Sequence, residues 1–231
     1  MADGFGLLVD STLGGIAMGL VALSSAEICA QNIELEQKSG TAKLSDHLAA
    51  CLRSQNASVK DIRYVLASNG PGSFTGIKVG LAFALGLQKA AAPEVRFWTA
   101  SSLKLFAEHF LKDQTSSAVL LPATRTRAAA VRVRAGMPAE VFDFNIESKE
   151  QLSSVKLENM YFLAPSPMLE FMLNHGSVKR VEQVKLDDVM PLVMQLLSKE
   201  LMRRAEAKDA SDQLEPFYLR LSSAEEKIAA R

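Results

Sequence analysis

The chain has 231 residues, of which 48% are hydrophobic and 23% are charged, as is typical of a soluble globular protein. Lys+Arg and Asp+Glu balance at 26 each, so no net charge directs the chain toward nucleic acid or a membrane surface. Cys29 and Cys51 have neither the spacing of zinc ligands nor the number of a disulfide framework, so we expect two reduced thiols. Residues 1–4 lack the basic region and apolar core of a signal peptide, and no apolar run reaches the roughly 18 residues of a membrane span. We therefore expect a soluble, cytoplasmic protein.

The first half of the chain predicts three strands followed by alternating helices and strands. Short apolar runs separated by turn residues predict strands over residues 5–10, 16–23 and 27–35. Further strands are expected at residues 62–68 and 95–98, and helices at residues 74–91 and 101–111. A helix is also expected around four residues spaced as i, i+4, i+7 and i+8, namely Leu44, Leu48, Cys51 and Leu52. The order β-β-β-α-β-α-β is typical of an α/β layer with mixed strand directions.

The second half predicts another group of strands and one long helix. We expect strands at residues 118–121, 129–134, 141–144 and 161–164, and a short helix at residues 168–173. The long helix carries an apolar face from Val189 to Leu201 and ends near Lys208. The simplest organisation is an α/β fold of two lobes, residues 1–99 and residues 100–231, with a last helix able to pack back on the N-terminal lobe.

A glycine-rich stretch between the strand at residues 62–68 and the next helix reads Asn69-Gly-Pro-Gly-Ser-Phe-Thr-Gly-Ile-Lys-Val-Gly80. It is not a P-loop, because Thr75 stands at the second glycine position and Lys78 is followed by no Ser or Thr. It also lacks the third glycine of the dinucleotide fingerprint. Pro71 sets the direction in which the chain leaves the strand, and Ser73 is well placed as the helix N-cap.

Gly76, Gly80 and Ala84 then recur every four residues and form a flat face of small residues. A second helix can approach such a face closely, and the face is flanked by Ile77, Leu81 and Phe83. The periodicity equally allows this face to pack on the protein's own sheet, and both alternatives stay open.

These motifs together resemble the TsaB family, also called YeaZ-like. The resemblance is carried by the stretch GPGSFTGIKVGLAFALGL, the strand and turn Leu8 to Thr12, the segment from Ser101 to Leu103 and the C-terminal Pro216-Phe-Tyr-Leu-Arg220. It implies the fold of the actin, sugar-kinase and Hsp70 superfamily (ASKHA), with two related α/β lobes and mixed sheets. It also implies a part in making N6-threonylcarbamoyladenosine at position 37 of tRNAs that read ANN codons.

The resemblance further implies a subunit that is not itself an enzyme. TsaB-like proteins are non-catalytic relatives of the transferase TsaD, dimerise with it through helices of the N-terminal lobe, and are joined by the ATPase TsaE. A lone subunit is expected to form a homodimer, to touch tRNA only indirectly, and to have no cofactor of its own, with ATP only in the assembled complex. The implied partner interface comprises Leu44, His47, Leu48, Cys51, Ser73, Phe74, Thr75, Gly76, Ile77, Gly80, Leu81 and Ala84.

The residues themselves argue against a TsaD-type metal site. TsaD-like proteins carry H-x-x-x-H in the helix that should begin near Ser101, and the matching positions here are Ser102 and Phe106. The histidines, His47, His109 and His175, have no histidine at i+4. No Ser/His/Asp or Cys/His arrangement suggests a peptidase, so we expect no catalytic residue and no metal.

Whether the chain binds a nucleotide depends on Asp10, Ser11 and Thr12. In the superfamily this turn faces ATP phosphates, whereas the alternative is a hairpin stabilised by its own Asx and Ser contacts. An independent ATP-binding enzyme of the same superfamily is therefore the second functional hypothesis.

The start of the second lobe departs from the family, which has an Asp-Ala-Arg segment followed by Glu-Val-Tyr. Here residues 123–130 retain an arginine, but alanines replace the acidic and aromatic residues. The arginines Arg125, Arg127, Arg132 and Arg134 form either a basic strand edge for tRNA phosphates or an ordinary solvated face.

Overall fold

The computed structural model describes residues 4–35, 42–90, 95–112, 116–122, 127–134, 136–145, 147–148, 150, 156–163, 177–209 and 216. The chain divides into two compact units. The first unit comprises Met1–Ser102 and Met190–Pro216, and the second comprises Leu103–Val189 and Phe217–Arg231.

The first unit contains a five-stranded sheet of order β3-β2-β1-β4-β5. The first three strands form an antiparallel meander, and β4 and β5 extend the sheet in parallel with β1. Its elements are β1 (Phe5–Asp10), β2 (Ile16–Ala22), β3 (Glu27–Glu34), α1 (Ala42–Ser54), the 3-10 turn η1 (Val59–Asp61), β4 (Ile62–Ser68), α2 (Phe74–Ala90) and β5 (Arg96–Ala100). This arrangement places β1 at the centre of the sheet, where nearly all of its residues are buried.

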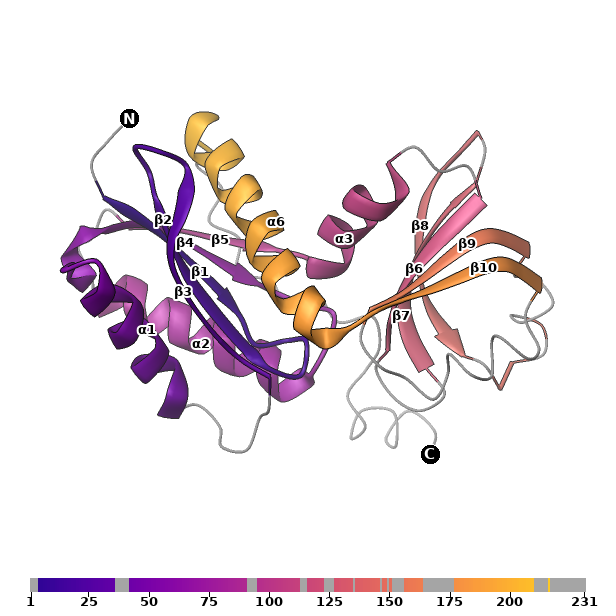
Figure 1. Ribbon diagram of the computed structural model, residues 1–231, viewed down its shortest axis with the longest axis horizontal. Coiled ribbons are helices and arrows are strands. Elements are labelled where there is room, and N and C mark those ends of the chain that lie inside the picture. The colour runs from indigo at the N-terminus through magenta and orange to yellow at the C-terminus, as the bar shows by residue number, and fades with distance from the viewer. Residues whose placement is uncertain are drawn as a thin grey trace. The chain divides into compact units, whose positions relative to one another are not determined.

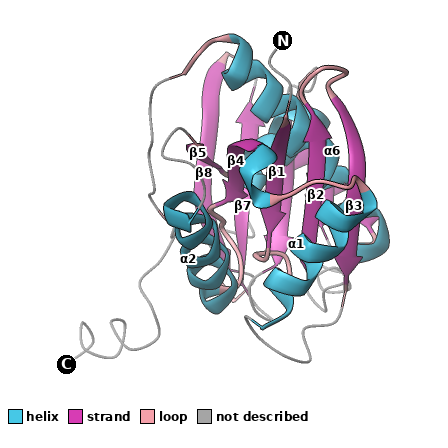
Figure 2. Ribbon diagram, turned by 90° about the vertical axis from the view of Figure 1, so that its left-hand side faces the viewer, coloured by secondary structure: helices cyan, strands magenta, loops and turns pink. Residues whose placement is uncertain are grey.

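Helices cover both faces of this sheet (Figures 1 and 2). Helices α1 and α2 lie on one face, where apolar side chains from both helices and from β1, β2, β4 and β5 form one core cluster. The opposite face is covered by α6 (Leu186–Glu206), which belongs to the first unit from Met190 onward. Gly6 in β1 lets α6 approach closely, because a methyl group on Gly6 would lie 2.7 Å from the Leu201 side chain.

The predicted face of α1 is confirmed. Leu44, Leu48, Cys51 and Leu52 are all buried in the core between α1 and the sheet. The helix ends at Ser54, and two residues later Asn56 takes a positive φ of 49°, which asparagine tolerates, while the Ala57 N–H donates back to the Leu52 carbonyl.

The second unit contains a sheet of order β10-β9-β6-β7-β8. Strands β6, β7 and β8 form an antiparallel meander, and β9 and β10 follow β6 in parallel. Its elements are α3 (Ser102–Leu111), which starts at the boundary of the first unit, β6 (Ser116–Pro122), β7 (Arg127–Arg134), β8 (Met137–Asn145), β9 (Lys156–Leu163) and β10 (Ser177–Val184). When the strands of each unit are numbered along the chain, both sheets have the order 3-2-1-4-5, so the two α/β units are related in topology.

The sequence did not predict β10. The short helix expected at residues 168–173, like Phe217 to Arg220 of the C-terminal motif, lies outside the described residues. Over the part of the chain that is described, no helix combines the length and the apolar character of a membrane span.

Candidate functional site

The candidate site is the turn that follows β1, at the carboxyl end of the central strand. Asp10, Ser11 and Thr12 are all buried there. Because β1 and β4 are parallel, Ser68 at the end of β4 lies beside this turn. Ligands of α/β proteins commonly bind at the carboxyl ends of parallel strands, so the contacts of this turn decide what the site can do.

The Asp10 carboxylate is held by groups of its own turn. It accepts hydrogen bonds from the Thr12 backbone N–H at 2.9 Å and from the Thr12 hydroxyl at 3.2 Å. The Thr12 hydroxyl also lies 3.3 Å from the Ser68 hydroxyl. Burial raises the pKa of Asp10 above its ordinary value, although hydrogen bonds from Thr12, Ser68 and Leu13 act in the opposite direction. The contacts of this turn are those of a hairpin stabilised by its own Asx residue, which was one of the two interpretations of the sequence.

The glycine-rich stretch closes over the turn. The Ser73 backbone N–H donates to the Thr12 carbonyl at 2.8 Å. A methyl group on Gly72 would lie only 2.2 Å from the same carbonyl oxygen, so only glycine permits this approach. Gly70 has a φ of +102°, a backbone conformation that other residues rarely adopt, and it precedes a cis peptide bond to Pro71.

Helix α2 begins directly above Ser11. Ser73 caps the helix as predicted, because its hydroxyl accepts a hydrogen bond from the Gly76 N–H at 3.2 Å. The Ser11 hydroxyl donates to the Gly76 carbonyl at 2.8 Å. A methyl group on Gly76 would lie 1.9 Å from the Ser11 carbonyl oxygen, and one on Gly80 would lie 2.4 Å from the Ser11 hydroxyl oxygen.

These distances show whether the face of small residues packs on a second helix or on the protein's own fold. Gly76, Gly80 and Ala84 face the protein's own hairpin and core. The glycines of the motif therefore let backbone pack against backbone at the place where the superfamily turn would face phosphates.

The structure shows where the residues of the expected partner interface lie in the isolated chain. Most of those side chains lie in the core of their own unit and are not accessible to a partner, namely Leu44, His47, Leu48, Cys51, Gly76, Ile77, Gly80, Leu81 and Ala84. The periodicity identified residues that share a face but did not reveal that the protein's own sheet and the turn after β1 cover it. Ser73 is half-buried, whereas Phe74 and Thr75 are exposed.

The accessible side of α2 was not singled out from the sequence, apart from Phe74 and Thr75. Phe74 and Leu85 are 41% and 37% exposed and are among the few large apolar side chains in the described residues that are so accessible. The Lys78 ammonium lies 4.0 Å from the centre of the Phe74 ring, a cation–π contact. We call the exposed residues Phe74, Thr75, Lys78, Ala82, Leu85 and Lys89 the outer stripe of α2. The sequence signal that could have identified this stripe is the presence of large apolar residues, Phe74 and Leu85, on the helix face opposite the small residues.

His47 forms part of a small polar cluster at the start of α1. Its Nε2 lies 3.3 Å from the Glu34 carboxylate, which also pairs with Lys43. The hydrogen bond from Lys43 lowers the pKa of Glu34. This cluster joins the end of β3 to α1 and is a structural contact.

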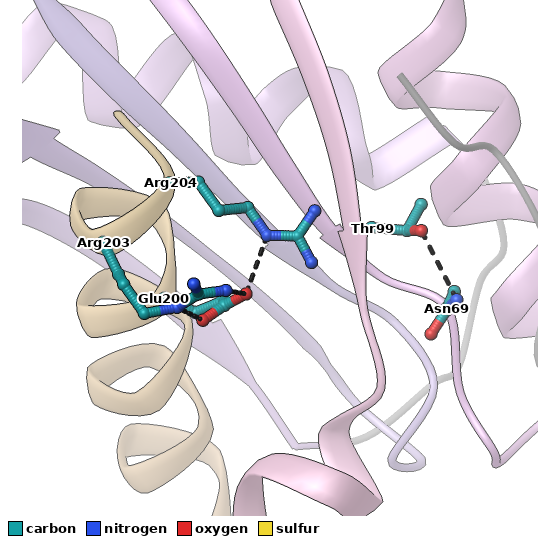
Figure 3. A network of polar contacts seen from close by, with 5 residues as sticks. All are labelled: Asn69, Thr99, Glu200, Arg203 and Arg204. Atoms are coloured by element: carbon teal, nitrogen blue, oxygen red, sulfur yellow. Dashed lines mark hydrogen bonds and ion pairs between the residues drawn. The ribbon is translucent and has the colours of Figure 1, made fainter. Parts of the chain in front are cut away.

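Two other polar contacts of the first unit are drawn in Figure 3. The Asn69 side-chain amide donates to the Thr99 hydroxyl at 3.4 Å, which links the exits of β4 and β5. On α6, Arg203 and Arg204 both donate to the Glu200 carboxylate at 2.7 Å. The first contact joins two neighbouring strands, whereas the second lies within α6 alone.

The arginines of the second unit pair with acidic side chains. Arg127 pairs with Asp143, and Arg132 pairs with Glu140, both from the adjacent strand β8. Arg132 is buried and also lies over the Phe142 ring at 4.9 Å. Arg134 is exposed, and Arg125 lies outside the described residues. The strand therefore presents fewer free positive charges than its sequence alone indicates.

Ser102 and Phe106, at the positions that match the TsaD histidines, are fully buried. In the described ranges, no three His, Cys, Asp or Glu side chains gather in a way that could hold a metal ion.

Comparisons with known proteins agree with this geometry. Residues 27–139 match the model of the family TsaD, tRNA N6-adenosine threonylcarbamoyltransferase. The fold is similar to that of YeaZ from Pseudomonas aeruginosa, at 15% identity and a TM-score of 0.63, over 94% of this chain and 100% of that one. The expected resemblance to YeaZ-like proteins is confirmed in the fold.

Other solved structures share this YeaZ-like fold. One is an uncharacterized Pseudomonas aeruginosa protein with similarity to peptidase YEAZ, at 13% identity and a TM-score of 0.63, covering 94% of this chain and 100% of that one. Another is a Bacteroides thetaiotaomicron protein of unknown function with an actin-like ATPase fold, at 11% identity and a TM-score of 0.52, covering 85% and 96%. The expected ASKHA fold is therefore confirmed as well. No curated protein sequence matches the chain.

Proposed function

We propose that this chain is a non-catalytic subunit in the synthesis of N6-threonylcarbamoyladenosine at position 37 of tRNAs that read ANN codons. In this proposal it docks onto a TsaD-like transferase as a heterodimer and orients it, and a TsaE-like ATPase joins the assembly. The chain contributes no cofactor, works in the cytoplasm, forms a homodimer when alone, and touches tRNA only through its partners.

The observation that carries this proposal is the closure of the turn after β1. Asp10, Ser11 and Thr12 are buried, and Thr12, Ser68 and Gly76 are among the hydrogen-bonding partners within the chain. A phosphate would have to displace the backbone of residues 72–76, which approaches Ser11 and Thr12 closely. A buried carboxylate would also repel the phosphate, since no basic side chain pairs with Asp10 in the described residues.

The outer stripe of α2 supports the docking part of the proposal. Its exposed Phe74 and Leu85 are apolar, which is typical of a surface that a partner covers. The match to the TsaD family over residues 27–139 includes the whole of α1 and α2, and so supports a role in the same pathway.

Isothermal titration of Mg-ATP into the isolated chain separates this proposal from an independent ATP-binding enzyme. A scaffold should show no saturable heat with ATP alone but should bind the purified transferase. Tight ATP binding that is abolished by Asp10→Ala would instead establish the enzyme hypothesis.

A further inference from the structure

Ser11 contacts two successive turns of α2 from the buried side of that helix. We infer that Ser11 is a positioning residue, which fixes α2 so that the outer stripe is presented to the docking partner. The inference rests on the proposed docking function, but the position of α2 can be measured without any partner.

Two atoms of Ser11 define where α2 sits. The hydroxyl oxygen donates to the Gly76 carbonyl at 2.8 Å and occupies the space that a Gly80 side chain would take. The Ser11 carbonyl oxygen lies where a Gly76 side chain would be. Because Gly76 and Gly80 are one turn apart on the same face, Ser11 restrains both the rotation and the axial position of the helix.

Two further hydrogen bonds lie at the ends of α2, from the Ser73 N–H to the Thr12 carbonyl and from the Gln88 side chain to the Val95 carbonyl, whereas its remaining contacts with the core are less directional. Its buried side chains Ile77, Leu81 and Leu87 are aliphatic, and such contacts tolerate small shifts and repacking. A hydrogen bond depends steeply on angle, and a contact between backbone atoms has no rotamer that can adjust. The polar contact at Ser11 therefore determines the position more sharply than the apolar contacts do.

The outer stripe lies across the helix from this contact. Successive helical residues turn by about 100°, so Lys78 lies roughly 200° around the helix from Gly76. A rotation of α2 about its axis would move Phe74, Lys78 and Leu85 together relative to the rest of the unit. Ser11 thus connects the closed turn to the docking surface through a single helix.

The pair Ser11 and Gly80 permits a sharp double-mutant test. Ser11→Ala removes the hydrogen bond and leaves space beneath α2. Gly80→Ala places a methyl group 2.4 Å from the Ser11 hydroxyl oxygen, which must leave its bond or displace the helix. In the double variant this methyl group meets only the Cβ of residue 11, at 3.7 Å, which is ordinary van der Waals contact.

We expect each single variant to bind the purified transferase roughly three- to tenfold more weakly, as fits the loss of one hydrogen bond. The double variant should bind more tightly than either single variant, since its helix can return to the native position. Val21→Ala, in β2 on the α6 side of the sheet, lowers stability without touching α2 and should leave the affinity unchanged.

Amide chemical shifts of Lys78 and Leu85 in the isolated chain provide the second readout. Both single variants should shift these exposed amides, and the double variant should restore them. Affinities whose losses simply multiply in the double variant, or α2 amides that stay at their native shifts in both single variants, would overturn the inference. If the wild-type chain binds no transferase, the proposed function fails, while the amide shifts still decide the role of Ser11.

Discussion

The backbone N–H of Thr12 donates a hydrogen bond to the Asp10 carboxylate at 2.9 Å inside a turn that is buried from solvent. The contact shapes the turn, but it leaves a carboxylate in a poorly solvated place without a basic partner among the described residues. The free energy of unfolding should therefore depend on the charge of this one group.

Asp10→Asn should make the protein more stable at neutral pH. The pKa of Asp10 is raised above its ordinary value of 3.8 by burial, so the folded state binds the proton more tightly than the unfolded chain does. Its contribution to stability is thus fully present below pH 3.8 and is lost as the pH rises through the raised pKa. Asparagine keeps an acceptor for the Thr12 N–H without carrying the charge.

Urea unfolding at several pH values checks this prediction. The advantage of Asp10→Asn over wild type should grow as the pH rises from acidic to neutral, while the exposed Asp46→Asn serves as the control. A variant less stable than wild type at neutral pH would show that the ionised carboxylate stabilises the turn.

Alanine at Gly76 and at Gly86 should have opposite effects, although both glycines lie within α2. A methyl group at Gly76 would lie 1.9 Å from the Ser11 carbonyl oxygen, whereas one at Gly86 would meet nothing within 4 Å. Gly76→Ala should lower the free energy of unfolding by about 3 kcal/mol or prevent folding, because backbone atoms must move. Gly86→Ala should raise it by up to about 1 kcal/mol through helix propensity.

Chemical denaturation of both variants measures this contrast. Equal effects of the two substitutions would mean that α2 does not pack on the β1–β2 turn as described.

Arg132→Ala should destabilise the second unit. The Arg132 guanidinium is buried, pairs with Glu140 and lies over the Phe142 ring. Its removal should lower the free energy of unfolding by about 1 to 2 kcal/mol, since packing and charge contacts are lost together. The exposed Arg134→Ala is the matched control and should change stability by less than about 0.5 kcal/mol. Thermal unfolding of the two variants would contradict this assignment if Arg134→Ala were the more damaging.

Much of the fold could be predicted because its elements carry strong local signals. The run Ile62–Ser68 is apolar and bounded by turn residues, and it forms β4 over that same range. Ser73 precedes an uninterrupted helical segment and caps α2 as expected. Strand β10 was missed because the valines of its sequence, SVKRVEQV, stand at every third position between pairs of polar residues, which is not the period of two of a strand. It also lies at the edge of its sheet, where no continuous apolar run is needed.

The candidate site could be predicted only in part. The period of Gly76, Gly80 and Ala84 shows that they share a face, but not which surface covers that face. The surface that covers this face includes Ser11, which is 65 residues away from Gly76 and contacts it only in the folded chain. Likewise, the spacing of Arg127 and Arg132 gives no sign of Asp143 and Glu140 on the neighbouring strand.

The most direct test of the proposed docking role is size-exclusion chromatography with light scattering on a mixture of the chain and a purified TsaD-like transferase. The account predicts a heterodimer that is lost with Leu85→Glu on the outer stripe of α2. The control Met137→Glu replaces an exposed apolar side chain of the second unit and should leave the complex intact. Absence of a complex with the wild-type chain, or a complex that persists with Leu85→Glu, would contradict the account.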